Sequence, residues 1–415
     1  MVTRSPPAPA TAECTGKATN SYPNILAGQF KLVGGTDFTQ PLFTEAQSNG
    51  SGYLRLTGFT AAGLPITAPV TANLGVRAVS PQILYTKFTD RINNLGVDGI
   101  RMSDIQTAGY TSTNAHFERI TPDANLQQTY LQRVQATVAD IKPTFFTEWL
   151  GNNDVLGYAT SGGAVASRTI TPAATFTANT KLILDALVKD GAKGLVSNIP
   201  DVAGIPFFNT VGPSFRASLA AAAVPSAAPF IYTTGVLAPG QPNTRVTTAK
   251  VSDIRDAAGA GNLLLTLTAS PYVSLYGRPG GKYWRDFYQQ VKPSLPATYT
   301  LTQFLGPALL GGLAIDTTKN FGQDIANPFP STLLLDGTEQ TAVTNATNGF
   351  NTTLAAEANA RNLALFDANA FFRSVAGNGI ITNTVPNSAA YISGNLFSLD
   401  GVHPTPAATQ LWRMR

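Results

Sequence analysis

Predicted strands and helices alternate between about residues 90 and 200, and this alternation limits the possible folds more than any other feature of the chain. Residues 127–141 have apolar side chains at helical spacing, and residues 171–188 form a second predicted helix. β-Branched and aromatic runs predict buried strands at 144–150 and 194–199. Strands that alternate with helices are typical of a parallel sheet covered by helices on both faces, so we predict an α/β fold.

The second half of the chain interrupts this pattern and then returns to it. Proline, glycine and aromatic residues are frequent from 201 to about 327, and we interpret this stretch as a loop-rich, cap-like insertion. A long helix is predicted at 342–361 and a last strand at 363–366. Residues 20–415 are therefore expected to form a single domain that carries one insertion.

Composition favours a folded protein and argues against several classes of partner. Hydrophobic residues make up 43% of the 415 residues, which is enough to bury a sizeable core. The net charge of +4 comes from scattered Lys and Arg, so we predict no nucleic-acid partner. No apolar run reaches the roughly 18 residues that span a bilayer, so no transmembrane segment is expected. The single cysteine, Cys14, and the two histidines, His116 and His403, favour neither a disulfide nor a metal site.

The C-terminal region contains a candidate pair for acid–base chemistry. Asp400 and His403 are three residues apart, so in a turn the carboxylate can hold the imidazole in the tautomer of a general base. The same spacing also occurs in ordinary surface turns. The other histidine, His116, has Phe117 and Ile120 beside it, and we interpret it as a packed or surface residue.

Two further motifs follow predicted strands. The sequence G-N-N-D at 151–154 comes directly after strand 144–150, and ligands of open α/β sheets bind at the carboxyl ends of the strands. Gly99 lies in a predicted short strand and glycine turn at 96–100, where the backbone N–H can approach a ligand closely. Each motif, taken alone, is better explained by turn chemistry, because Asn and Gly both tolerate a left-handed backbone.

Together and in this order, the motifs resemble the SGNH (GDSL) hydrolase superfamily, in particular its lipase-like esterases of Bacteroidetes type. N-L-G-V-D-G at 94–99 resembles the glycine block, G-N-N-D at 151–154 resembles the G-x-N-D block, and D-G-V-H at 400–403 resembles the final D-x-x-H block. The resemblance covers most of residues 20–406. It implies a flavodoxin-like three-layer α/β/α fold with a parallel sheet.

The resemblance also implies an activity, namely a serine ester hydrolase that needs no cofactor. A serine would attack the ester carbonyl, His403 would take its proton, and Asp400 would orient His403. The Gly99 N–H and the Asn153 side chain would hold the oxyanion. Acyl or acetyl esters are the implied substrates, whether small molecules, lipids or acylated glycans. Export to the cell envelope or beyond is implied as well, although residues 1–18 have no apolar core of a signal peptide.

The chain as written lacks the G-D-S-L serine block and the first strand that should precede it. Ser5 lies in a proline-rich run, and Ser21 lies in N-S-Y-P, which the family has downstream of the block. We expect residues 1–19 to be a frameshifted or non-native segment, because their codons in a shifted frame are compatible with G-D-S-L and its usual continuation. Residues 406–415 are compatible with an ordinary final helix in the same way.

Two hypotheses from different classes remain open. The first is the serine ester hydrolase, which we expect to be inactive in this chain because the nucleophile is missing. The second is a non-catalytic glycan- or lipid-binding protein on the same fold. A flavodoxin-like cofactor binder is a more distant alternative, because no phosphate-cradling glycine loop is visible in the sequence.

Overall fold

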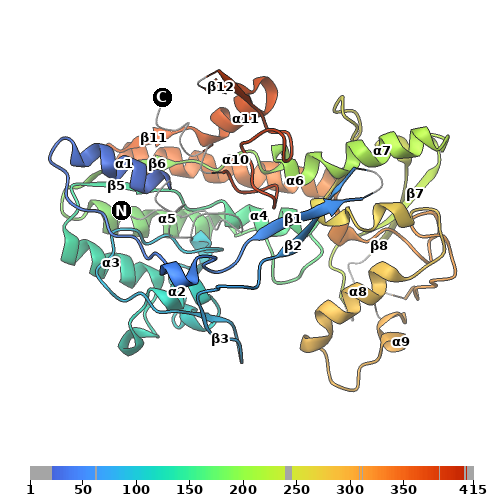
Figure 1. Cartoon of the computed structure of the whole chain (residues 1–415), viewed down its shortest axis with the longest axis horizontal. Coiled ribbons are helices and arrows are strands. Elements are labelled where there is room, and N and C mark those ends of the chain that lie inside the picture. Colours follow the sequence, from blue (N-terminus) through green and yellow to red (C-terminus); the bar gives the residue numbers. More distant parts are fainter. Residues whose placement is uncertain are drawn as a thin grey trace.

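The computed structural model describes residues 21–60, 63–238, 245–307, 309–310, 312–382, 384–405 and 408. The expected frameshifted segment, residues 1–19, lies outside this part of the chain, as do Cys14 and nearly all of 406–415. Helices and strands are mixed throughout the described residues, and Figure 1 shows them along the chain.

A parallel three-stranded sheet joins distant parts of the sequence. It consists of β5 (Phe145–Glu148), β6 (Lys193–Ser197) and β11 (Ala364–Phe366), in the order β11-β6-β5. The strands predicted at 144–150, 194–199 and 363–366 are confirmed, and so is their parallel direction. The predicted α/β class is thereby confirmed at the level of a mixed fold with a parallel sheet.

The two faces of β5 pack against different elements. Phe145 contacts Phe30 of α1 (Tyr22–Lys31), with ring centroids 4.9 Å apart. Its neighbour Phe146 is fully buried in the main core. Neighbouring side chains of a strand point to opposite faces, so α1 and the main core cover opposite faces of β5. Gly194 of β6 makes room for Phe146, because a Cβ at residue 194 would lie 2.5 Å from that ring.

Long helices form the main core together with the sheet. They are α3 (Tyr130–Ile141), α4 (Asn153–Thr160), α5 (Ala173–Val188) and α10 (Gly337–Ala360), and α5 contacts both α3 and α10. The Thr129 side chain caps α3, since its hydroxyl accepts a hydrogen bond from the Gln132 N–H at 3.1 Å. Phe176 of α5 stacks on Phe350 of α10 with centroids 4.0 Å apart. The helices predicted at 127–141, 171–188 and 342–361 are therefore confirmed, with small shifts of their ends.

The prediction of a short strand within 96–100 is wrong, whereas the predicted glycine turn is present. Side chains bind this backbone: the Asn114 amide donates to the Asp98 carbonyl at 2.7 Å, and the Asn153 amide donates to the Ile100 carbonyl at 2.9 Å. No strand of the described residues pairs with it. Gly99 has a φ of +71°, which places it in the left-handed region.

The insertion expected at 201–327 contains regular elements as well as loops. They include α7 (Val211–Ala221), β7 (Pro229–Thr234), β8 (Arg245–Lys250) and α8 (Lys282–Val291), which lie to one side of the three-stranded sheet in Figure 1. Buried side chains of these elements and of the segments packed around them form a second cluster, the insertion core, which includes Trp284, Phe230 and Phe329. The antiparallel pair of β9 (Leu264–Leu265) and β10 (Leu334–Leu335) connects this region to the main core.

The remaining helices and strands of the described residues are short, apart from α11 near the C-terminal end. They are β1 (Leu54–Phe59), β2 (Pro65–Pro69), β3 (Val76–Ala78), β4 (Leu84–Tyr85), α2 (Ala115–Arg119), α6 (Pro206–Asn209), α9 (Leu301–Phe304), α11 (Ala368–Asn378), β12 (Ile380–Thr382) and β13 (Val385–Asn387). Within the described ranges, no helix combines the length and the apolar character needed to cross a membrane.

Candidate functional site

Asp400 and His403 form a hydrogen-bonded pair in the C-terminal turn. The His403 Nδ1 atom lies 2.5 Å from Asp400 Oδ2. The other carboxylate oxygen, Oδ1, accepts from the backbone N–H groups of Val402 and His403 at 2.9 Å and from the Ser398 hydroxyl at 2.5 Å. Gly401 closes the turn with a φ of +68°, a conformation that favours glycine. The three-residue spacing thus gives the side-chain contact that the sequence suggested.

The surroundings of Asp400 keep its carboxyl group ionised at neutral pH. Burial alone would raise the pKa of Asp400, but the hydrogen bonds from His403 and Ser398 outweigh it and hold the pKa below its usual value. A carboxylate beside Nδ1 favours the tautomer in which Nδ1 carries the hydrogen and Nε2 the lone pair. The pair therefore has the arrangement of a general base and its orienting acid.

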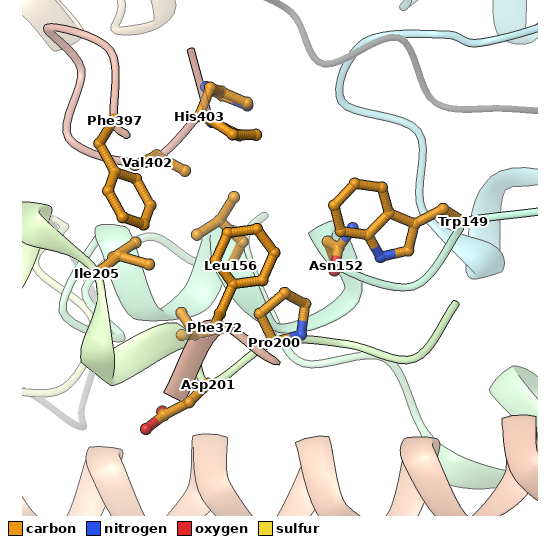
Figure 2. A pocket seen from close by; sticks show the side chains of 12 residues that line it. Trp149, Asn152, Leu156, Pro200, Asp201, Ile205, Phe372, Phe397, Val402 and His403 are labelled. Carbon is orange, nitrogen blue, oxygen red and sulfur yellow. The ribbon is translucent and has the colours of Figure 1, made fainter. Parts of the chain in front are cut away.

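His403 lies at one end of an apolar pocket, which Figure 2 shows from close by. The pocket lies at the carboxyl ends of β5 and β6, where open α/β sheets bind ligands. Its volume, including the part open to solvent, is about 600 Å³. The lining residues are Trp149, Asn152, Leu156, Pro200, Asp201, Val202, Ile205, Phe372, Phe397, Val402, His403 and Pro404.

The G-N-N-D motif begins α4 and ties it to the segment after Gly99. The Asn153 amide donates to the Ile100 carbonyl at 2.9 Å. The buried Asp154 carboxylate accepts from the backbone N–H groups of Met102 at 2.7 Å and Ser103 at 3.3 Å. Burial raises the pKa of Asp154 to about 6, against the effect of these bonds. Gly99 and Asn153, the predicted oxyanion groups, are thus brought near each other, but neither lines the pocket.

Asn152 is a candidate site residue that the sequence analysis did not single out. Its residue surface is 7% exposed, and neither side-chain amide atom has a hydrogen-bond partner among the described residues. It lines the pocket together with His403. Leaving a buried amide unpaired costs about 1–3 kcal/mol per group, so a bound polar group would be favoured here. The doubled Asn in G-N-N-D was the available signal, but the family pattern directs attention only to Asn153.

No serine lines the pocket within the described part of the chain. Ser398 donates to Asp400 and is thereby directed at the carboxylate of the pair. Ser21 donates to the Gln40 side chain at 2.9 Å, and Ser5 lies outside the described residues. The structure therefore brings together the base and its orienting acid, but no serine of the described residues lines the pocket with them.

The second histidine packs against a ring and an acidic side chain. His116 lies 4.7 Å from the Tyr85 ring centroid, and its Nε2 is 3.7 Å from Asp98 Oδ2. Asp98 precedes Gly99, so His116 borders the predicted glycine block without belonging to the Asp400–His403 pair.

The described residues contain no group of three or more His, Cys, Asp or Glu side chains that could hold a metal ion.

Comparisons of the chain with known proteins found no relative. No family model matches the chain, and no curated protein and no solved structure matches it either.

Proposed function

We propose that His403 and Asp400 are the general base and its orienting acid in the catalytic triad of a serine ester hydrolase of the SGNH type. The proposed fold is a flavodoxin-like three-layer α/β/α fold. The observation that carries the proposal is the 2.5 Å contact between Asp400 and His403 at the end of an apolar pocket. The parallel sheet, with packed elements on both faces of β5, is consistent with the proposed fold.

In the proposed reaction, a serine hydroxyl attacks the ester carbonyl carbon while His403 Nε2 takes the hydroxyl proton. Asp400 stabilises the imidazolium that forms, because its carboxylate stays ionised beside Nδ1. The C–O bond to the alcohol then breaks, and His403 returns the proton to the leaving oxygen. Water releases the acyl group by the same steps, which regenerates the serine. Proton transfer by a positioned histidine typically accelerates such steps about 10²–10⁴-fold.

Three N–H donors are proposed for the oxyanion of the tetrahedral intermediate. They are the Gly99 backbone N–H and the Asn153 side chain, to which we add the Asn152 amide, which lines the pocket and has no partner among the described residues. A single such donor is typically worth about 10²–10³ in rate. Because no described serine lines the pocket, we expect the 415-residue chain itself to have no ester turnover.

The test is to sequence the DNA that flanks the coding region and to express a frame-repaired chain beside the present one. Both chains are treated with a fluorophosphonate and with a short-chain nitrophenyl ester. We expect labelling and turnover only in the repaired chain, with both lost in His403→Ala. His116→Ala is the matched control and should retain both. If no serine block exists in any frame and neither chain is labelled, the esterase proposal fails.

A second candidate, a non-catalytic lipid-binding protein, is favoured by one observation. The pocket retains an apolar wall and an unpartnered polar amide although no serine of the described residues lines it. This candidate predicts ligand binding without covalent labelling, even after the serine block is restored.

A further inference from the structure

We infer that the pocket beside His403 binds the hydrocarbon chain of a short- or medium-length acyl group, with the acyl carbonyl or carboxylate at Asn152. The inference rests on the proposed function only in one respect, namely that the bound acyl group belongs to an ester that the site would cleave. Binding of the chain itself depends on the pocket walls, so it can be tested in the present polypeptide.

The walls of the pocket are hydrocarbon contributed by four separate parts of the chain. Leu156 comes from α4, Ile205 from the segment after β6, Phe372 from α11 and Phe397 from the C-terminal region. In Figure 2 these four side chains gather below His403. Burying a methylene group against such walls is worth roughly 0.8 kcal/mol, which corresponds to about a fourfold gain in affinity.

The few polar groups at the pocket do not suit a sugar ring. Asp201 is the only acidic residue among the described residues that line the pocket, and its Oδ1 accepts from the Ala203 N–H at 3.0 Å. Figure 2 shows its carboxylate directed away from the other side chains. The indole N–H of Trp149 donates to the Asn198 carbonyl at 3.1 Å. A glycan carries many hydroxyl groups, and burying them without partners is unfavourable, so these walls favour an acyl chain.

Asn152 and His403 provide a polar end to this apolar space. Both Asn152 amide atoms are buried and lack partners in the described part of the chain, so the N–H₂ can donate to a carbonyl or carboxylate oxygen. His403 lies at the same end and is oriented by Asp400. An acyl group has this pattern, with one oxygen-bearing end and a chain that makes no hydrogen bonds.

The experiment measures binding of a fatty-acid series from acetate to dodecanoate to the 415-residue chain by calorimetry. Acetylated xylo-oligosaccharide is the competing ligand class. We expect no measurable binding of acetate or of the oligosaccharide, and roughly fourfold tighter binding for each added methylene until the pocket is filled. Leu156→Trp, which fills the pocket, should abolish octanoate binding. Leu182→Trp places the same side chain at a position 39% exposed on α5 and should leave binding unchanged.

A second substitution and a stability measurement distinguish loss of binding from loss of the fold. Asn152→Leu should weaken octanoate binding at least fivefold, while the unfolding temperature of each variant reports on its fold. Equal binding by Leu156→Trp and Leu182→Trp, or preference for the oligosaccharide, would overturn the inference. Octanoate binding without fluorophosphonate labelling of the frame-repaired chain would instead overturn only the esterase proposal. Labelling without any dependence on chain length would overturn only the acyl pocket.

Discussion

Glu148, at the end of β5, is a buried carboxyl group whose ionisation opposes folding. One oxygen accepts from the Leu150 N–H at 2.9 Å, and the other has no partner among the described residues. Burial raises the pKa of Glu148 from its ordinary value of 4.5 to about 8. Between these two pH values the folded chain holds a proton that the unfolded chain has released. The free energy of unfolding must therefore fall as pH rises from 4.5 to about 8.

Glu148→Gln should remove this pH dependence, because an amide does not ionise. We expect the variant to have an unfolding free energy about 2–4 kcal/mol higher than that of the wild type at pH 8–9, and a similar one at pH 4–5. Urea unfolding at a series of pH values measures the difference. A difference that stays constant across this range would show that folding leaves the pKa of Glu148 at its ordinary value.

Asp400 affects the pH dependence of the unfolding free energy in the opposite direction from Glu148, because folding lowers the pKa of Asp400. Its stabilising effect is present above its ordinary pKa of 3.8 and is lost as pH falls through the lower folded value. We expect Asp400→Asn to reduce the unfolding free energy by about 1–3 kcal/mol at pH 7, and by less at pH 3. Asp37→Asn is the control, since Asp37 pairs with Lys31 at an exposed site and should have no measurable effect.

The contrast between His403 and Asn152 shows which site residues the sequence can reveal. The Asp400–His403 contact closes within a single turn, so spacing alone suggested it correctly. The role of Asn152 depends on its burial and on its lack of a partner among the described residues, and it shares the pocket with residues that are distant in the chain. No local pattern encodes that arrangement.

At the scale of elements, Gly162 holds the end of α4 against the segment before β10. Its φ is +58°, and a Cβ there would lie 1.9 Å from the Ser331 carbonyl oxygen. We expect Gly162→Ala to lower the unfolding free energy by about 2–5 kcal/mol, from steric overlap together with the left-handed backbone. Gly349→Ala is the control, because Gly349 lies exposed in α10 with open space around its Cα.

The control should change stability in the opposite direction. Alanine is favoured over glycine within a helix, so Gly349→Ala should raise the unfolding free energy by about 0.5–1 kcal/mol. Thermal unfolding of the two variants beside the wild type measures both effects. A Gly162→Ala variant as stable as the wild type would mean that α4 and residue 331 can separate without cost.

Strands were predicted correctly where the local sequence determines the structure. They were predicted wrongly where the structure depends on pairing with a distant strand. Residues 144–150 and 194–199 are runs of β-branched, aromatic and other apolar residues that are consistent with buried strands, and β5 and β6 lie there. Residues 96–100, which contain two glycines, form no strand, and the side chains of Asn114 and Asn153 donate to the carbonyls of Asp98 and Ile100 there. Whether a strand forms depends on its partner, and the partner is distant in sequence.

At the scale of the whole molecule, the described residues contain two large cores that share one pair of strands. Leu264 and Leu335, which face each other in the ladder, belong to the main core. Their neighbours Leu265 and Leu334 belong to the insertion core. The sequence indicated an inserted region but not this connection, because two-residue strands leave almost no pattern to detect.

Because β9 and β10 contribute to both cores, we expect the two cores to unfold together. Leu265→Ala should lower the unfolding free energy by about 2–5 kcal/mol, as expected for a buried leucine. Native-state hydrogen exchange separates the regions: amides of β6 and of α8 should lose protection by the same amount if unfolding is shared. Loss confined to α8 and β7 would mean that the insertion opens by itself. In that case the insertion would be an independent folding unit. The stability of the insertion core would then not contribute, through the β9–β10 pair, to the stability of the sheet that carries the candidate site.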